Sequence, residues 1–287
     1  MRAISTDAFL LVDKPAGLTS HDVVAIVRRA LGTRKVGHSG TLDPFATGLL
    51  VLLAGRGTRL IRFVPDDPKE YQAVIRFGRE TDTDDGTGQE TRTAAPPPPE
   101  LVRESLAALT GSLSQVPPAY SAKHVNGQRA YALARRGDAP DLPPVPVVVH
   151  GWDVVAQDAD SLTARVSCRA GTYIRALARD LGRLCHSAAH LEALRRTRIG
   201  PFSVDDADTI ERLREGGARP QPLRLALGDI IEQVVDPEDA RRVAHGMRIA
   251  ATLPGERAAL LDEQGELIAI AVRAGDEWQP DVVLGSA

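Results

Sequence analysis

Apolar and polar residues recur along the chain with two periods, and each period predicts a different kind of element. An apolar run at 9–12 predicts a strand that ends at the turn sequence DKPAG. Over 21–31 apolar residues recur at helical spacing, with Thr19 or Ser20 as the N-cap and Gly32 as the residue that ends the helix. The chain is therefore expected to open with a strand followed by a helix.

The same patterns predict elements along the rest of the chain. We expect strands at 49–54, 71–78, 145–155 and 161–168, helices at 59–64, 100–109, 173–185 and 237–244, a further element from 190, and a hairpin at 258–272. Two stretches, 36–48 and 79–99, are predicted to be loops, the second of them exposed. A change in the sequence pattern after Leu227 predicts a domain boundary near residue 228.

The composition is that of an ordinary globular protein, because 43% of the 287 residues are hydrophobic and 25% are charged. The first residues lack the charged-then-apolar layout of a secretory signal, and the longest apolar run, 48–55, is far too short to cross a bilayer. We interpret Cys168 and Cys185 as reduced thiols. These features predict a cytoplasmic protein that does not associate with a membrane.

The net charge of −3 argues weakly against nucleic-acid binding, but the charge is unevenly distributed. Residues 1–75 carry 10 Lys and Arg against 7 Asp and Glu, and residues 165–200 carry 8 against 2. Residues 201–287 carry 9 against 17. A polyanion would be attracted to the first two segments and repelled by the last. Ordinary solvated surface charge is the alternative that composition leaves open.

The densest group of candidate residues is the sequence GHSGTLDPFATG at 37–48. Its glycines allow the backbone to approach a ligand closely, and His38 and Asp43 lie five residues apart within it. Asp43 is a candidate nucleophile, general base or metal ligand. Alternatively, Asp43 caps a turn and Pro44 begins a helix. The surrounding glycines favour the chemical role.

Other candidates are single residues or short runs. Tyr71 opens a strand, where a tyrosine usually packs but can also stack on a nucleobase. Arg175 lies in the first turns of a predicted helix, where its charge opposes the helix dipole. A bidentate pair with a carboxylate would compensate it, and a solvated surface arginine is the alternative. The basic run at 194–198 is compatible with phosphate contact and with plain surface charge. His186 and His190 have the spacing of a metal pair, but no second cluster completes a site.

Five blocks of this sequence resemble the TruB-type pseudouridine synthases and follow that family's order. The most specific is 37–55, which resembles the family's central motif GH-small-G-small-LDPxATG. In chain order, the blocks are the Lys-Pro motif at 10–24, the central motif, the tyrosine strand with its TDTxD turn at 69–88, the stretch 115–137, and the arginine helix at 171–182. The resemblance covers about residues 9–200.

The resemblance implies an α+β fold in two domains. Residues 1–228 would form the pseudouridine synthase catalytic domain, in which a largely antiparallel mixed sheet carries the active-site cleft. Residues 229–287 would form a small, β-rich, PUA-like RNA-binding domain. Lys14 and Pro15, which lie in the first block, are expected to support the pocket rather than to react.

The resemblance also implies a reaction and a role for each candidate residue. The family isomerises uridine 55 in the T-loop of tRNA, without a metal or an organic cofactor. Asp43 aligns with the catalytic aspartate, which attacks either C1′ of the ribose or C6 of the uracil, and Arg175 aligns with the arginine that pairs with it. The remaining residues align with groups around the substrate: Tyr71 with the tyrosine stacked on the target base, His38 with the histidine that helps to displace the flipped nucleotide, and Tyr173 and Leu194 with residues that contact or flank the uridine.

The expected partner is therefore tRNA, bound through its T-arm and, by the C-terminal domain, at its acceptor arm. The family suggests a monomer. Two alternatives remain open at this point. The protein could be a guide-RNA-dependent relative, as in box H/ACA particles, or a tRNA-folding chaperone that uses the same groove without chemistry.

Overall fold

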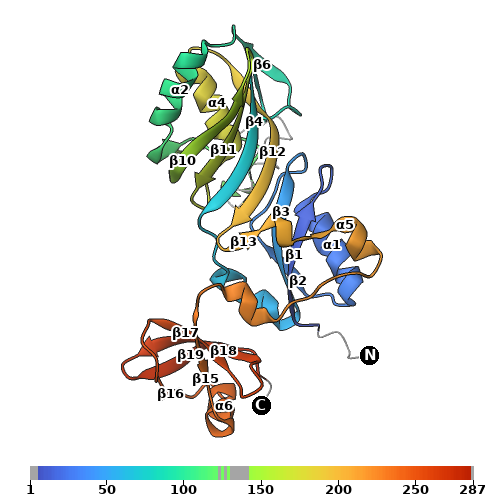
Figure 1. The fold of residues 1–287 in the computed structure, drawn as a ribbon, viewed down its shortest axis with the longest axis vertical. Helices are drawn as coiled ribbons and strands as arrows, with labels where there is room; N and C mark the ends of the chain where they lie inside the picture. The colour runs from blue at the N-terminus through green and yellow to red at the C-terminus, as the bar shows by residue number, and fades with distance from the viewer. Residues whose placement is uncertain (1–5, 122–123, 126–127, 130–141, 286–287) are drawn as a thin grey trace. The chain divides into compact units, whose positions relative to one another are not determined.

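The computed structural model describes residues 6–121, 124–125, 128–129 and 142–285. The chain forms two compact units, and Figure 1 labels the elements of both. The first unit comprises Met1–Asp43, Leu49–Pro65 and Val204–Ala287, and the second comprises Pro44–Gly48 and Asp66–Ser203. Parts of the predicted block 115–137, namely 122–123, 126–127 and 130–137, lie outside the described residues.

The first unit contains a small sheet covered by a helix. Its elements up to residue 227 are β1 (Ala8–Lys14), α1 (Ser20–Leu31), β2 (Val36–Ser39), β3 (Thr47–Ala54, which begins in the second unit), η1 (Gly55–Phe63), η2 (Val204–Asp206), β14 (Asp208–Thr209), α5 (Ile210–Arg214) and η3 (Leu223–Leu227). The strands neighbour one another in the order β14-β1-β3, with β2 paired to β3. The β1–β14 pair is parallel and the β2–β3 pair is antiparallel.

Helix α1 forms where the sequence predicts it. The Thr19 hydroxyl accepts a hydrogen bond from the Asp22 N–H at 3.1 Å, and the Thr19 N–H donates to the Asp22 carboxylate at 2.8 Å, which is a capping box. Gly32, with φ of 64°, ends the helix. The apolar face of α1 packs into one core with β1 and β3, and this core includes Val23, Val27 and Leu52. The strand and the helix predicted at the start of the chain are confirmed.

The second unit is built on an antiparallel sheet. Its elements are β4 (Lys69–Phe77), β5 (Arg79–Thr81), β6 (Glu90–Thr93), α2 (Pro99–Ala108), β7 (Gly111–Gln115), β8 (His124–Val125), β9 (Gln128–Arg129), β10 (Val145–Gln157), β11 (Ser161–Cys168), α4 (Ile174–Leu184), β12 (Ala189–Ile199) and β13 (Phe202–Ser203). Strands β12, β4, β11, β10 and β7 lie side by side in that order, and every neighbouring pair is antiparallel. Helices α2 and α4 contact each other, and α4 packs on β12 (Figure 1).

The two predicted loops are wrong in part. Residues 36–39 form β2, and residues 79–93 contain the β5–β6 hairpin. The segment 80–85 is also largely buried: Glu80, Asp84 and Asp85 are 4%, 7% and 5% exposed. Polar composition predicted exposure here because the arginines that pair with these carboxylates lie about a hundred residues further along the chain.

The last part of the first unit contains a separate sheet. Its elements are β15 (Ile231–Val234), α6 (Pro237–Ala244), β16 (Ile249–Ala250), β17 (Arg257–Leu261), β18 (Leu267–Ala274) and β19 (Glu277–Val283). The strand order is β15-β17-β18-β19-β16. Helix α6 confirms the predicted helix at 237–244, and the antiparallel pair β17–β18 confirms the hairpin at 258–272. Trp278 is fully buried in this part, and its indole N–H donates to the Gln233 side-chain oxygen at 2.7 Å.

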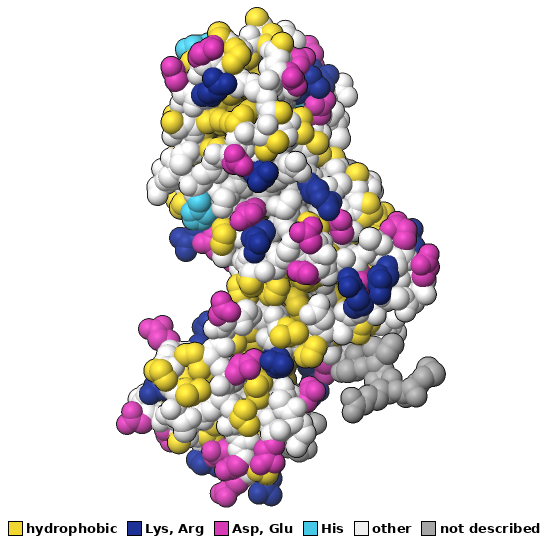
Figure 2. Space-filling model, viewed as in Figure 1, with side chains coloured by type: hydrophobic (Ala, Val, Ile, Leu, Met, Phe, Trp, Pro, Cys, Tyr) yellow, Lys and Arg dark blue, Asp and Glu magenta, His cyan; other side chains and the backbone are white. Residues whose placement is uncertain are grey.

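The C-terminal sheet has one further set of contacts, made by a row of arginines on η1. Arg59 donates to the Val283 carbonyl at 2.6 Å, Arg62 pairs with the Asp281 carboxylate at 2.8 Å, and Arg56 donates to the Leu284 carbonyl. Spacing of three residues places these side chains along one side of a 3₁₀ helix. Acidic side chains are spread over the part of the molecule that holds this sheet (Figure 2), as the charge count of the last segment predicts.

Candidate functional site

The residues before Asp43 are anchored to the start of α1. The Ser20 hydroxyl accepts a hydrogen bond from the Leu42 N–H at 3.0 Å and donates one to the Leu42 carbonyl at 3.2 Å. Ser20 and Leu42 are both buried, whereas Asp43 is only half-buried. His38 lies on β2, and its ring meets that of His21 edge to face, with centroids 6.0 Å apart. Asp43 therefore follows a fixed point of the chain and retains access to solvent.

The end of the same motif is fixed in the second unit. Thr47 and Gly48 pair with Arg195 and Arg196 of β12 in a parallel register. Gly48 has φ of +106°, and a Cβ there would lie 2.7 Å from the backbone nitrogen of Arg196 and closer still to its carbonyl oxygen. Only glycine can adopt this positive φ and also let the Arg196 backbone approach this closely without displacing β12.

Tyr71 and Leu194 lie on one face of the β4–β12 pair. Tyr71 is directly opposite Arg196, and Ala73, two residues further along β4, is opposite Leu194. Because side chains on a strand alternate between faces and opposite residues share a face, these four side chains project to the same side. The structure thus brings together two predicted site residues that are more than a hundred residues apart in sequence.

Arg196 is a charged residue in an unusual place, since it is only 1% exposed. Burial lowers the pKa of its guanidinium group, and the phenol of Tyr71 acts in the opposite direction. The basic run at 194–198 is therefore not a uniform solvent-facing surface, and plain surface charge is wrong for Arg196. Its buried charge lies directly beside the tyrosine that the sequence predicts to stack on a base.

Arg175 is held by several acceptors in the second unit. It is 5% exposed, so the alternative of a solvated surface arginine is wrong. Its Nη1 donates to the Thr83 carbonyl at 2.8 Å, and its Nη2 donates to the Tyr120 carbonyl at 2.9 Å. The Asp85 carboxylate lies 3.8 Å from Nη1. The Asp85 carboxylate therefore lies at ion-pair distance from this guanidinium, and the pairing of Arg175 with Asp43 that the resemblance implies stays a prediction.

Two further arginines of α4 continue this arrangement at intervals of four residues. Arg179 donates to the Asp84 carboxylate at 2.8 Å, and Arg183 donates to the Glu80 carboxylate at 2.7 Å. One face of α4 thus matches the acids of 80–85 in reverse order, and we call these three pairs the arginine ladder: Arg175–Asp85, Arg179–Asp84 and Arg183–Glu80.

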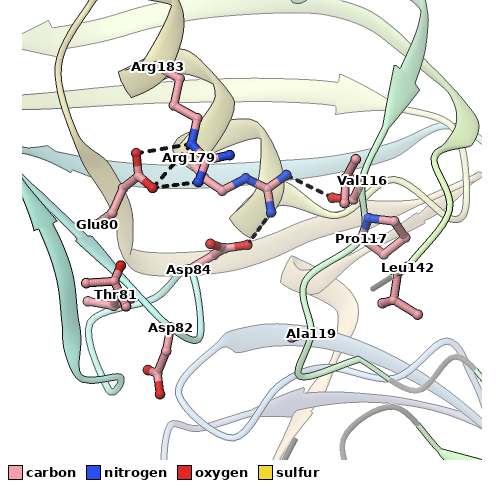
Figure 3. A pocket seen from close by; sticks show the side chains of 11 residues that line it. Glu80, Thr81, Asp82, Asp84, Val116, Pro117, Ala119, Leu142, Arg179 and Arg183 are labelled. Carbon is pink, nitrogen blue, oxygen red and sulfur yellow. Dashed lines mark hydrogen bonds and ion pairs between the residues drawn. The ribbon is translucent and has the colours of Figure 1, made fainter. Parts of the chain in front are cut away.

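The ladder borders a pocket of about 270 Å³ in which Arg179 points between Asp84 and the Val116 carbonyl (Figure 3). Burial raises the pKa of Asp84 to about 6, although Arg179 acts to lower it. The pKa of Glu80 is lowered: burial raises it, but hydrogen bonds from Arg183 and Arg92 outweigh that effect. The acids of this segment therefore differ in how readily they take up a proton.

Tyr173 is the N-cap of α4 and is half-buried. Its side chain makes no capping hydrogen bond, but its backbone is bound on both sides by one side chain. The Tyr173 N–H donates to Oε1 of Gln115 at 2.9 Å, and Nε2 of Gln115 donates to the Tyr173 carbonyl at 3.1 Å. The start of the arginine helix is thereby tied to the end of β7.

The six predicted site residues thus fall into three groups. Tyr71 and Leu194 share a sheet face, Tyr173 and Arg175 share the start of α4, and His38 and Asp43 belong to the first unit. Three further residues contact members of these groups, namely Asp85, Gln115 and Arg196, and of these the sequence marks Arg196 only as part of the basic run at 194–198. Asp85 lies within the TDTxD turn, which was a usable signal, whereas nothing local distinguished Gln115.

The described part of the chain offers neither a metal site nor a membrane-spanning helix. Among its residues, no three His, Cys, Asp or Glu side chains gather as a metal site. Within the same residues, no helix is both long enough and apolar enough to span a membrane. His190 is buried and contacts the Arg79 carbonyl at 2.9 Å, whereas His186 is exposed. The two histidines therefore do not share an environment.

Comparison with known proteins agrees with the pattern of motifs. The N-terminal domain model of the TruB family pseudouridylate synthases matches residues 28–174, and the model of the tRNA pseudouridylate synthase B C-terminal domain matches 175–235. The chain is 44% identical to tRNA pseudouridine synthase B of Thermobifida fusca (strain YX), over 98% of this chain and 99% of that protein. It is 40% identical to the protein of that name from Mycobacteroides abscessus, over 99% and 98% of the two chains.

Solved structures show that the fold is shared more widely. The chain superposes with a TM-score of 0.72 on a protein in the crystal structure of the archaeal box H/ACA sRNP Nop10-Cbf5 complex, with 22% identity, covering 99% of this chain and 88% of that one. The α+β fold with a largely antiparallel mixed sheet, predicted by resemblance, is confirmed. Taken with the two family models and the full-length relatives, these findings show that the chain belongs to the TruB family of pseudouridylate synthases.

Proposed function

We propose that this protein isomerises uridine to pseudouridine in tRNA, at position 55 of the T-loop, without a guide RNA. The observation that carries the proposal is full-length similarity, at 44% identity, to a protein named tRNA pseudouridine synthase B. The motif GHSGTLDPFATG at 37–48 lies within it. This similarity is one of sequence and covers nearly all of both chains, so it is closer than a shared fold alone.

The reaction needs few groups, because the nucleotide keeps the same composition and one proton lost is matched by one proton gained. The bond from C1′ of the ribose to N1 of uracil breaks, a bond from C1′ to C5 forms, the C5 proton departs and N1 gains a proton. Asp43 is the proposed nucleophile, attacking either C1′ or C6. The half-buried position of Asp43, directly after the anchored Leu42, supports this role because a nucleophile must be both fixed and reachable.

The other site residues act on the substrate. A base stacked in the T-loop must leave the stack before its glycosidic bond can be rearranged, and His38 is proposed to help displace it. Tyr71 would stack on the extruded uracil and is a candidate for proton transfer, and Leu194 would flank the uridine. Tyr173 is proposed to contact the uridine, and Arg175 to pair with the nucleophile. The shared sheet face of Tyr71 and Leu194 supports their joint role.

The decisive assay uses unmodified tRNA transcript and purified protein alone. We expect wild-type protein to form one pseudouridine, at position 55, detected by mass spectrometry of nuclease fragments, and none in a transcript with cytidine at that position. Asp43→Asn should reduce the rate at least 10⁴-fold, because an amide is a poor nucleophile. The matched control is Asp160→Asn, an exposed carboxylate outside the motif, which should retain full activity.

Three outcomes distinguish the alternatives. Pseudouridine formation by Asp43→Asn at the wild-type rate would refute the nucleophile assignment. Modification that occurs only after a guide RNA is added would favour the guide-dependent class. Binding and refolding of tRNA by the wild-type protein, without any modification, would favour the chaperone.

A further inference from the structure

Gln115 is a polar residue in an apolar position. It ends strand β7, pairs with Val145 on the neighbouring strand β10, and is 2% exposed. Burying an amide costs free energy unless its polar atoms are hydrogen-bonded. In Gln115 the amide oxygen and one N–H are bonded, both to the backbone of one neighbour, Tyr173.

The two hydrogen bonds to Tyr173 define one orientation of the Gln115 amide. The Tyr173 N–H needs an acceptor, which only Oε1 supplies, and the Tyr173 carbonyl needs a donor, which only Nε2 supplies. The Tyr173 carbonyl also accepts the first helical hydrogen bond, from the Leu177 N–H at 3.1 Å. Gln115 therefore holds both polar groups of the residue at which α4 begins.

The same stretch of chain is tied to α4 at two more points. The Val116 carbonyl accepts from Arg179 at 2.8 Å, and the Tyr120 carbonyl accepts from Arg175 at 2.9 Å. In these two contacts, arginine side chains of α4 reach out to the backbone of the stretch. At Gln115 the direction is reversed, since a side chain of the stretch reaches the backbone of the helix start.

We propose that Gln115 is a positioning residue for the uridine pocket, which acts by fixing the backbone of Tyr173 and, two residues later, the direction of Arg175. This inference rests on the proposed function, because that function is what places Tyr173 and Arg175 at the substrate. Holding the N-cap backbone on both sides fixes the φ and ψ angles of Tyr173, and these set the direction of the Cα–Cβ bond from which its ring extends. The helix start has no side-chain cap of its own to do this.

The chemistry of the amide explains why glutamine is needed. Methionine has nearly the same length and shape but can form neither hydrogen bond. Ionised glutamate can accept from the Tyr173 N–H but would face the Tyr173 carbonyl oxygen with a second acceptor. Protonated glutamic acid carries one donor and one acceptor, as the amide does. Because the site is buried, the pKa of a glutamic acid placed there would be raised, so its protonated form would be accessible in mildly acidic buffer.

The test compares Gln115→Met, Gln115→Glu and the control Gln157→Met in the full-length protein. Gln157 also donates to a backbone carbonyl, that of Pro99 at 3.4 Å, but it lies on β10 and does not contact Tyr173. We expect the single-turnover rate of Gln115→Met at saturating tRNA transcript to fall at least tenfold, with the Kd for tRNA changed less than threefold. Gln157→Met should stay within twofold of wild type in both quantities.

The pH profile separates positioning from a general loss of structure. Relative to wild type at each pH, the rate of Gln115→Glu should recover severalfold between pH 8 and pH 5.5, whereas that of Gln115→Met should not. The glutamate variant also carries the test if the methionine variant fails to fold. A Gln115→Met rate within twofold of wild type, or a flat relative profile for Gln115→Glu, would overturn the inference.

Hydrogen exchange gives a readout that does not depend on activity. Amides over 172–176 should exchange at least tenfold faster in Gln115→Met than in wild type, and at the wild-type rate in Gln157→Met. If wild-type protein forms no pseudouridine but this acceleration is present, the proposed function fails while the hold of Gln115 on Tyr173 stands. Unchanged exchange in Gln115→Met would remove the inference itself.

Discussion

Two residues of the second unit, Arg196 and Asp84, show how burial changes the chemistry of a charged side chain. Arg196 lies in the interior beside Tyr71, and Asp84 lies in the interior beside Arg179. In both cases burial acts on the pKa against the charged form. Neighbouring side chains offset part of the free-energy cost of burying a charge. Replacing a neighbour therefore changes the pKa of the buried group as well as the packing around it.

Asp84 should make the stability of the protein depend on pH. Its pKa is about 6 in the folded state against 3.8 ordinarily, so between these values the folded state binds more protons than the unfolded state. The free energy of unfolding therefore loses a contribution as the pH rises from about 4 to about 6. Asp84→Asn removes this titration and tolerates the local φ of 59°. Relative to wild type, the variant should gain on the order of 3 kcal/mol across that window.

Urea unfolding of both proteins at several pH values measures this difference. Only the change in the difference with pH is predicted, because the amide also weakens the pairing with Arg179 at every pH. A difference that stays constant from pH 4 to pH 6.5 would show that Asp84 does not titrate there.

At the scale of elements, close contact between β3 and β12 depends on Gly48. Gly48→Ala combines an unfavourable φ of +106° with overlap against the backbone of Arg196, so we expect the free energy of unfolding to fall by about 3 kcal/mol or more. Gly171→Ala is the matched control, because Gly171 has φ of +90° but no atom within 4 Å of the added Cβ. That control should cost about 1–2 kcal/mol.

Chemical denaturation of the two variants separates conformational strain from overlap. Equal costs for Gly48→Ala and Gly171→Ala would mean that β12 moves aside without penalty. The Gly48→Ala variant should also lose more pseudouridine synthase activity than the control, since Gly48 ends the motif that contains Asp43.

Elements whose signals are local could be predicted from the sequence, and elements that depend on distant partners could not. Helix α1 has its cap, its apolar face and its terminal glycine within fourteen residues, and it was found nearly to the residue. For the segment 80–85 polar composition predicts an exposed loop, and this is wrong because the arginines that balance its charges come from α4. For the site, motif resemblance identified six positions whose roles stay predictions. The sequence gives no signal for Gln115, because its side-chain amide bonds a backbone group, which any residue at position 173 other than proline would supply in full.

At the scale of the whole molecule, the C-terminal sheet has its own core. The buried cluster around Trp278 consists entirely of residues from 235 to 278 in the described part of the chain. The contacts from η1 include hydrogen bonds, the Phe63 ring with the Arg257 guanidinium 5.0 Å from its centroid, and a largely exposed ion pair, Arg62–Asp281, which is worth little. A domain beginning near residue 229, which stays a prediction, should therefore unfold separately from the rest.

The two tryptophans allow this to be measured. Trp152→Phe leaves Trp278 as the only tryptophan, so its fluorescence reports on the C-terminal sheet, while far-UV circular dichroism of the same sample reports on the whole chain. We expect the fluorescence transition in urea to precede most of the dichroism transition. Coincident transitions would show that residues 229–287 and the remainder unfold as one cooperative body.

The division of the chain into units has a consequence for the order of events at the ribosome. The second unit is nearly continuous in sequence and is complete once residue 203 has left the exit tunnel. The first unit begins synthesis earlier but lacks β14 and α5, whose Ile210 and Leu213 complete the core around β1 and α1. The core around the N-terminal strand and helix can therefore be completed only after the middle of the chain has been synthesised and can fold. This reverses the usual N-to-C order of co-translational folding.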